Sequence, residues 1–292
     1  MSEMRDISEQ NTKGDLIMNV GSFFSGIGGL DYGFEKEGFT VKWFIEKDTF
    51  CQAVLRKNYP GRPVFPDVNT MDYTTVEAVD ITIGGFPCQD ISQAGKGEGI
   101  KGKRSGLWKA YKEGIRILRP KIAVIENVPM LYKRGLNVVL ADLAEMGYDA
   151  EWFTLSAQEV GALHVRERLF IIAYSREFRQ LYLRFQEHSS KTGESSLSKI
   201  TPSFITYDWS LRVQRFKQET LSGQSGLSWC KDVRRIEDIK GRPNIPKPLF
   251  CGGRDGIPDW MDRIKGCGNA VVPQVGQFIA RRIKEVMNVG KD

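Results

Sequence analysis

The stretch "LIMNVGSFFSGIGGLDYGFEKEGFTVKWFIE", residues 16–46, decides the predicted fold. Its first apolar run, 16–24, reads as a buried strand, and the glycine-rich turn "FFSGIGG" leads from it into a stretch with helical spacing, 29–39. A second apolar run, 40–46, reads as the next strand and ends in Glu46. A strand, a glycine turn, a helix and another strand predict a parallel βαβ unit.

The same alternation of strands and helices continues to residue 174. Further strands are predicted at 79–85, 121–128, 150–157 and 168–174, and helices at 49–60, 106–120, 135–148 and 272–288. We therefore expect an α/β fold with a doubly wound, mostly parallel sheet of the Rossmann-like kind. Residues 175–250 break the rhythm and are rich in Ser, Gln, Arg and Lys, which predicts a second, smaller irregular domain.

Composition argues against several classes of protein. The 292 residues are 41% hydrophobic and 27% charged, which is ordinary for a globular chain with a large core. No apolar run approaches the ~18 residues of a membrane helix, and the polar N-terminal stretch does not read as a signal peptide. The five cysteines are widely spaced and only two histidines are present, so we expect neither a disulfide framework nor a metal site. A reducing, cytoplasmic location fits this composition best.

Positive charge is concentrated in one part of the chain. Residues 175–250 contain 14 Lys and Arg against 8 Asp and Glu, so this segment carries the whole formal net charge of +6. Such a local excess is expected of a segment that faces a polyanion such as a nucleic acid. A solvated surface with a mild basic bias would give the same count, and charge alone does not decide between the two.

The turn "FFSGIGG" is a candidate nucleotide-binding loop, because glycines let the backbone approach a ligand and aim a helix N-terminus at it. Glu46, at the end of the second strand, could accept hydrogen bonds from two ribose hydroxyls, and Asp67 could accept one from an adenine amine. A solvent-exposed acid at a strand end is the plain alternative for Glu46. The chain contains no GxxxxGKS or GxxxxGKT loop for phosphates, so S-adenosylmethionine is the predicted cofactor and NAD the alternative.

A second group of residues carries candidate chemistry. Cys88 follows the strand "VDITIGG" at the carboxyl edge of the sheet, where open α/β folds bind ligands, and Glu126 in "IENV" would lie beside it. Arg166 and Arg168, in "VRERLF", could bind a carbonyl oxygen, a phosphate or the acid there. A core thiol, a strand-end acid and a surface salt bridge are the plain alternatives. The basic, glycine-rich stretch 93–106 reads as a lid that closes on an anionic ligand, or as an ordinary surface loop.

These residue types fit one reaction. A thiolate that adds to C6 of a pyrimidine makes C5 enamine-like, so that C5 can attack a methyl sulfonium. A proton given by Glu126 to N3 would offset the charge that develops during this addition.

In their order and spacing the motifs resemble those of DNA (cytosine-5)-methyltransferases of the bacterial or phage restriction-modification type. The resemblance covers residues 18–174 and 256–288 and rests on "FSGIGG", "GGFPCQDISQAG", "RSGLW", "ENV", "VRERLF" and "GNAVVPQV". It implies an enzyme that transfers a methyl group from S-adenosylmethionine, leaving S-adenosylhomocysteine, to C5 of a flipped-out cytosine in a specific duplex DNA sequence. By the same resemblance Cys88 bonds covalently to C6 and Glu126 contacts N3 and the exocyclic amine. Arg168 would contact O2, and Arg166 would support the site.

The resemblance also implies a wider set of ligand-binding residues. The cofactor would be bound by Phe24, Ser25, Gly26, Gly28, Gly29, Glu46, Lys47, Asp67, Val68, Pro87, Leu107, Asn269 and Val271. The candidate DNA-binding residues are Gln89, Ser92, Lys96, Lys101, Lys103 and Arg104 around the nucleophile motif, and Arg212, Arg215, Lys217, Arg234 and Arg235 in the basic segment, where phosphate binding is the simpler expectation for any one residue.

The predicted organisation follows from this assignment. Residues 1–175 would form the catalytic and S-adenosylmethionine-binding domain, and 176–255 the target recognition domain. Residues 256–292 would return to the catalytic domain. Duplex DNA is the expected partner, with a possible cognate restriction endonuclease, and we expect a cytoplasmic monomer in a bacterial cell or phage-infected host.

One departure and two alternatives stand beside this reading. The family usually has Pro-Gln shortly before its arginines, whereas Leu163 and His164 stand here, which bears on how the arginines are supported. A tRNA cytosine-5 methyltransferase of the same fold would share nearly all catalytic motifs, although the basic segment 175–250 favours a reader of duplex DNA. A non-catalytic DNA-binding protein on a decayed enzyme scaffold is the other alternative, and the intact Cys88 and Glu126 argue against it.

Overall fold

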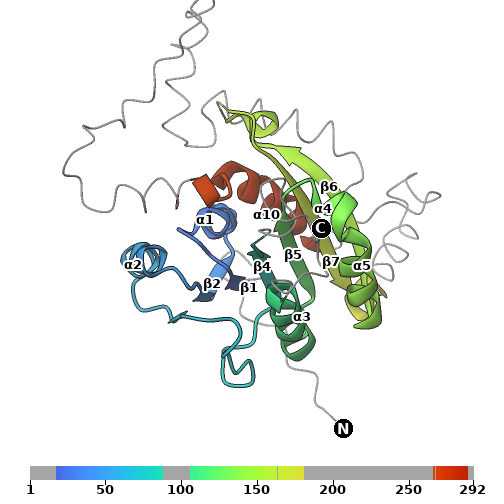
Figure 1. Cartoon of the computed structure of the whole chain (residues 1–292), viewed down its shortest axis with the longest axis horizontal. Helices are drawn as coiled ribbons and strands as arrows, with labels where there is room; N and C mark the ends of the chain where they lie inside the picture. Colours follow the sequence, from blue (N-terminus) through green and yellow to red (C-terminus); the bar gives the residue numbers. More distant parts are fainter. Residues whose placement is uncertain (1–17, 88–105, 163, 181–265, 267, 289–292) are drawn as a thin grey trace, which may run out of the picture.

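The computed structural model describes residues 18–87, 106–162, 164–180, 266 and 268–288 (Figure 1). Its strands are β1 (Asn19–Phe23), β2 (Thr40–Ile45), β3 (Val64–Phe65), β4 (Ile81–Gly85), β5 (Ile122–Asn127), β6 (Tyr148–Ser156) and β7 (Glu167–Ser175). Its helices are α1 (Gly29–Lys36), α2 (Thr49–Asn58), α3 (Gly106–Leu118), α4 (Leu131–Arg134), α5 (Leu136–Glu145), the short 3-10 helix η3 (Ala157–Val160) and α10 (Pro273–Asn288). The strands and helices predicted from the sequence are confirmed, and β3, α4 and η3 are additional.

In the described part of the chain, seven strands form one sheet in the order β3-β2-β1-β4-β5-β7-β6. The strands from β1 to β5 pair in parallel. In contrast, β7 runs antiparallel to both β5 and β6, because the short connection from β6 to β7 contains η3 and no crossover helix. The prediction of a doubly wound, mostly parallel α/β sheet is therefore confirmed.

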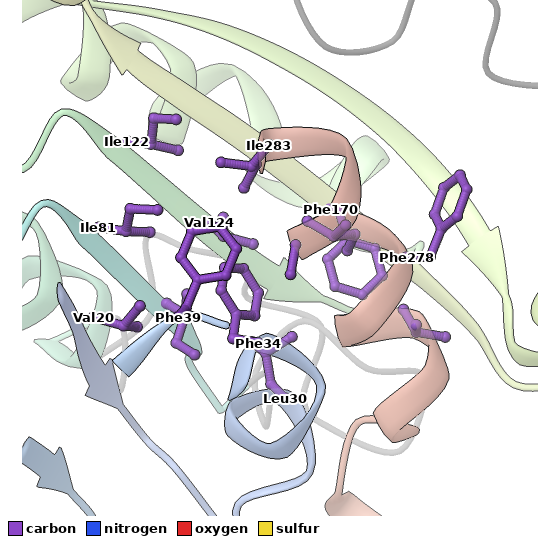
Figure 2. Close-up of a cluster of buried hydrophobic side chains, with 14 of the residues drawn as sticks. Val20, Leu30, Phe34, Phe39, Ile81, Ile122, Val124, Phe170, Phe278 and Ile283 are labelled. Carbon is purple, nitrogen blue, oxygen red and sulfur yellow. The ribbon is translucent and has the colours of Figure 1, made fainter. Parts of the chain in front are cut away.

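Helices cover both faces of the sheet, and each face has its own hydrophobic core. One core joins α1, α2 and α10 to strand residues such as Val20, Val124 and Phe170, and Figure 2 shows these side chains meeting over the sheet. The other core joins α3, α4 and α5 to strand residues such as Phe23 and Ile125. Because side chains alternate along a strand, each central strand supplies both cores, which explains its continuous apolar sequence.

The helix α10 packs beside α1, as the red and blue ribbons of Figure 1 show. The two backbones approach closely at a glycine, because a Cβ on Gly33 would lie 2.4 Å from the carbonyl oxygen of Pro273. The carboxylate of Glu37, which follows α1, accepts hydrogen bonds from the side chains of Gln277 at 2.8 Å and Arg281 at 2.9 Å. These contacts fix the last described helix against the first βαβ unit.

The strand order creates a topological switch point between β1 and β4. The chain runs outward from β1 through β2 to β3 and then returns to the other side of β1. In open α/β sheets, ligands bind outside the carboxyl ends of the strands at such a point.

The predicted domain boundaries near 175 and 255 stay predictions, because residues 181–265 lie outside the described ranges. No helix of the described ranges combines the length and the apolar composition of a membrane span.

A buried acid in the first turn of α1 gives a test of the packing. Asp31 is only 1% exposed, and burial raises the pKa of its carboxyl group to about 7. The nearby Ser22 hydroxyl lowers this pKa and so offsets the rise only in part. Between about pH 4 and pH 7 the folded protein therefore binds a proton that the unfolded chain has lost, so stability falls as the pH rises through this window. We expect Asp31→Asn to raise the free energy of unfolding by roughly 1–3 kcal/mol at pH 8 and to change it little at pH 4.

Urea denaturation of both proteins at several pH values measures this difference. The exposed Asp72, whose pKa is lowered by hydrogen bonds from Thr74, is the control, because Asp72→Asn should not stabilise the protein at pH 8. A gain from Asp31→Asn that is equal at pH 4 and pH 8 would exclude titration of Asp31 as its source.

Candidate active site

The predicted cofactor loop is a tight turn between β1 and α1. Three of its residues have positive φ angles, at 51° for Phe24, 56° for Gly26 and 83° for Gly28. A left-handed backbone is costly for phenylalanine, and such strain is found mostly where surrounding structure imposes it, often at functional sites. The turn is held to the neighbouring strand by the amide of Ser25, which donates to the carbonyl oxygen of Ile45 at 3.2 Å. The loop thus begins the helix α1 at the carboxyl edge of the sheet, beside the switch point.

Glu46 directly follows β2 and braces this loop. Its carboxylate accepts a hydrogen bond from the amide of Gly26 at 2.7 Å and another from the amide of Asp48 at 2.7 Å. An ionised carboxylate has about four acceptor positions, so two backbone bonds leave capacity for hydroxyl groups of a ligand. The bracing role is a finding of the structure that the sequence did not predict.

Asp67 lies near Glu46 at the same edge, because β2 pairs with β3 and the amide of Glu46 donates to the carbonyl oxygen of Phe65. The backbone amide of Asn69, with a second bond from its side chain, holds the pKa of Asp67 below its ordinary value. The ammonium group of Lys47 lies 3.6 Å from the Asp67 carboxylate. Val68, the next residue, is buried in the core below α3. The two predicted nucleoside-binding acids are therefore neighbours in space.

The segment before α10 meets the cofactor loop. A Cβ on Gly29 would lie 2.1 Å from the carbonyl oxygen of Val271, so only glycine allows α1 to begin this close to the segment. Asn269, two residues earlier, is exposed. The structure thus brings the backbone of Val271 to the loop after β1. Leu107, at the start of α3, packs at the margin of the other core.

Glu126 lies near the end of β5, opposite Gly85 at the end of β4. Its side chain is 12% exposed, and its Oε1 lies 2.8 Å from Nε of Arg168. Burial raises the pKa of Glu126, and the guanidinium groups of Arg168 and Arg166 only partly offset this rise. A carboxyl group in this position can hold a proton more readily than an exposed one, as a general acid must.

Arg166 links this edge of the sheet to the segment before α10. One of its terminal nitrogens donates to the carbonyl oxygen of Gly268. Its Nε and other terminal nitrogen are buried without a hydrogen-bond partner in the described part of the protein. Burial and the positive charge of Arg168 lower the pKa of Arg166. Two buried, unused guanidinium donors beside Glu126 are suited to bind an oxygen of a ligand.

Several predicted residues fall outside the described ranges. Cys88 is among them, although Phe86 and Pro87, which precede it, are described. The predicted DNA-binding residues also lie outside, namely Gln89, Ser92, Lys96, Lys101, Lys103, Arg104, Arg212, Arg215, Lys217, Arg234 and Arg235. Leu163 is outside as well, and His164 is exposed. These assignments stay predictions.

Known proteins are similar to this chain in sequence. The model of the C-5 cytosine-specific DNA methylase family matches residues 18–238. The type II methyltransferase M2.BsuMI of Bacillus subtilis (strain 168) is 32% identical, and the match covers 82% of this chain and 58% of that protein. M.NgoBI of Neisseria gonorrhoeae is 36% identical over 52% of this chain and 49% of its own length. M.FnuDI of Fusobacterium nucleatum is 26% identical over 92% of this chain and 95% of its own.

The matches to the first two of these relatives span only about half of their length. The family model, however, matches most of this chain, and its matched range includes "FSGIGG", "GGFPC", "ENV" and "VRERLF". The chain therefore belongs to the C-5 cytosine-specific DNA methylase family.

Proposed function

We propose that this protein is a DNA (cytosine-5)-methyltransferase that methylates C5 of a flipped-out cytosine in a specific duplex DNA sequence. The observation that carries the proposal is the cluster of Glu126, Arg166 and Arg168 at the carboxyl ends of β4 and β5. From Gly85, which pairs with Glu126, the chain continues through two residues to Cys88. An acid and two guanidinium groups at this edge of the sheet, with a cysteine that follows β4 in the sequence, supply the groups that addition to a pyrimidine requires.

The thiolate of Cys88 begins the proposed reaction by forming a bond to C6 of the cytosine. The electron pair displaced from the C5–C6 bond moves toward N3, which takes the proton held by Glu126. S-adenosylmethionine, when bound, supplies the methyl group that C5 takes. Loss of the C5 proton to a base and return of the N3 proton to Glu126 then restore the C5–C6 double bond and release Cys88 as a thiolate. Arg168 keeps Glu126 in place through their 2.8 Å ion pair and would offer a donor to O2, while Arg166 would support the site through its bond to Gly268.

The cofactor would lie at the carboxyl edge beside the switch point. Its ribose hydroxyls would donate to Glu46 and its adenine amine to Asp67, while Val271 and Asn269 would approach its methionine end. The chain contains no GxxxxGKS or GxxxxGKT loop for phosphates, so an adenosine without phosphates suits this site better than a dinucleotide. This chemistry favours S-adenosylmethionine over NAD.

Removing the Glu46 carboxylate should weaken cofactor binding. We expect Glu46→Ala to raise the Kd for S-adenosylmethionine about 10- to 100-fold, because ribose hydrogen bonds and the brace on Gly26 are both lost. Isothermal titration calorimetry measures the Kd. Glu77→Ala is the matched control, since Glu77 is an exposed acid that pairs with Lys42. An unchanged Kd for Glu46→Ala would remove Glu46 from the cofactor site.

The proposed function is tested by trapping. Duplex DNA of diverse sequence, with 5-fluorocytosine in place of cytosine, is incubated with the protein and S-adenosylmethionine and run on a denaturing gel. Fluorine at C5 cannot leave as a proton does, so we expect a stable protein–DNA band that requires the cofactor. Mapping of the trapped base would identify the recognised sequence.

The same experiment with substituted tRNA separates the alternatives. A band with tRNA and none with DNA would favour a tRNA methyltransferase. No band with either would contradict methyl transfer and favour a binding protein.

The basic composition of residues 175–250 supports DNA as the substrate, and we assign target recognition to residues 176–255. We also propose that the protein is a cytoplasmic monomer and that a cognate restriction endonuclease is its partner.

A further inference from the structure

Asn127 is a buried polar residue that the reaction above does not use. It is the last residue of β5, follows Glu126 directly and is 2% exposed. Its Nδ2 donates to the carbonyl oxygen of Phe86 at 3.0 Å, and its Oδ1 accepts from the amide of Val128 at 2.9 Å. The side chain therefore links the end of β5 to the residue that follows β4.

The bond to Phe86 lies one residue beyond the end of the β4–β5 ladder. The last ladder pair is Gly85 with Glu126, so Asn127 continues the connection where backbone pairing stops. The ring of Phe86 is also buried, with its centroid 5.5 Å from that of Trp108. Trp108 in turn donates to the carboxylate of Asp142 at 2.7 Å. Phe86 is thus held through its carbonyl oxygen and through its ring.

We propose that Asn127 is a positioning residue for the nucleophile. By fixing the carbonyl oxygen of Phe86, it sets the direction in which the chain leaves β4 toward Cys88, two residues later. The inference rests on the proposed function, because it assigns Asn127 to the reaction of Cys88. The end of β5 would then contribute two residues to the reaction. Glu126 would give the proton, and Asn127 would hold the chain that leads to the nucleophile Cys88.

The size of the expected effect follows from geometry. A mutation that displaces a reacting atom by about 1 Å can slow the reaction roughly 100-fold, even when the mutated residue lies far from the reacting atoms. A neutral hydrogen bond that only satisfied a buried carbonyl group would act mainly on stability. A positioning role would therefore appear as a loss of rate, and a purely structural role as a loss of stability.

The test compares Asn127→Ala and Asn127→Asp with the wild type in single-turnover methyl transfer at saturating DNA and S-adenosylmethionine. Both variants should slow transfer about 100-fold, because neither retains the amide donor, while the Kd for S-adenosylmethionine changes less than about 3-fold. Asn127→Asp keeps the shape of the side chain, so it separates loss of the donor from loss of volume. Val139→Ala is the control, since Val139 is fully buried on α5 rather than at the ends of β4 and β5, and its truncation should lower stability without slowing transfer.

Two results would overturn the inference. One is a wild-type rate for Asn127→Asp, which would show that the donor is not needed. The other is a rate loss in both Asn127 variants that Val139→Ala reproduces at an equal loss of stability. A wild-type protein that transfers no methyl group to any DNA would instead overturn the proposed function, and this inference with it.

Discussion

Replacing Cys88 by serine is expected to slow methyl transfer by at least about 10³-fold while leaving S-adenosylmethionine binding unchanged. A few per cent of an ordinary thiol is ionised at neutral pH, and the thiolate is a strong nucleophile. A serine hydroxyl ionises far less and would need a strong neighbouring base to attack C6. The proposed contacts to the nucleoside, by contrast, lie on Glu46 and Asp67, and the substitution leaves the side chain of Pro87 unchanged.

Single-turnover transfer of a labelled methyl group measures the rate, and calorimetry measures cofactor binding. Cys51→Ser is the matched control, because Cys51 is a buried cysteine on α2 and should affect stability more than transfer. Transfer by Cys88→Ser at more than a tenth of the wild-type rate would exclude Cys88 as the nucleophile. A trapped band with 5-fluorocytosine DNA in the same variant would exclude it as well.

The placement of the acids at strand ends could be predicted from the sequence. Glu46 and Glu126 each close an apolar run of strand length, and the carboxyl ends of parallel strands meet at one edge of a sheet. The structure has both residues at that edge, with Glu46 directly after β2 and Glu126 within β5. Local periodicity and one topological rule were therefore sufficient for the outline of the fold and for the placement of these two acids.

Contacts between distant segments could not be predicted in this way. The reversal of β7, which faces Arg168 toward Glu126, depends on the lack of a crossover helix between β6 and β7. The bond from Asn127 to Phe86 joins residues that are 41 positions apart. The sequence places Asn127 beside Glu126 but gives no sign of its partner. Side-chain pairing of this kind follows from strand register, which periodicity does not determine.

Gly85 shows how closely the register of β4 and β5 constrains the site. A Cβ on this residue would lie 2.2 Å from Oε2 of Glu126, well inside van der Waals contact. The φ angle of Gly85 is not in the left-handed region, so the backbone itself tolerates alanine. The added methyl group would therefore push aside the carboxylate, the flexible end of the side chain, and disturb its ion pair with Arg168.

We accordingly expect Gly85→Ala to slow methyl transfer about 100- to 1000-fold while lowering the free energy of unfolding by less than about 2 kcal/mol. A double-mutant cycle isolates the cause, because Glu126→Ala removes the group that the methyl displaces. In that background Gly85→Ala should slow the residual transfer by less than about 3-fold. An equal slowing in both backgrounds would mean that Gly85 acts on something other than Glu126. A smaller slowing in the Glu126→Ala background would instead show that β4 must end without a side chain at Gly85 so that Glu126 keeps its position on β5.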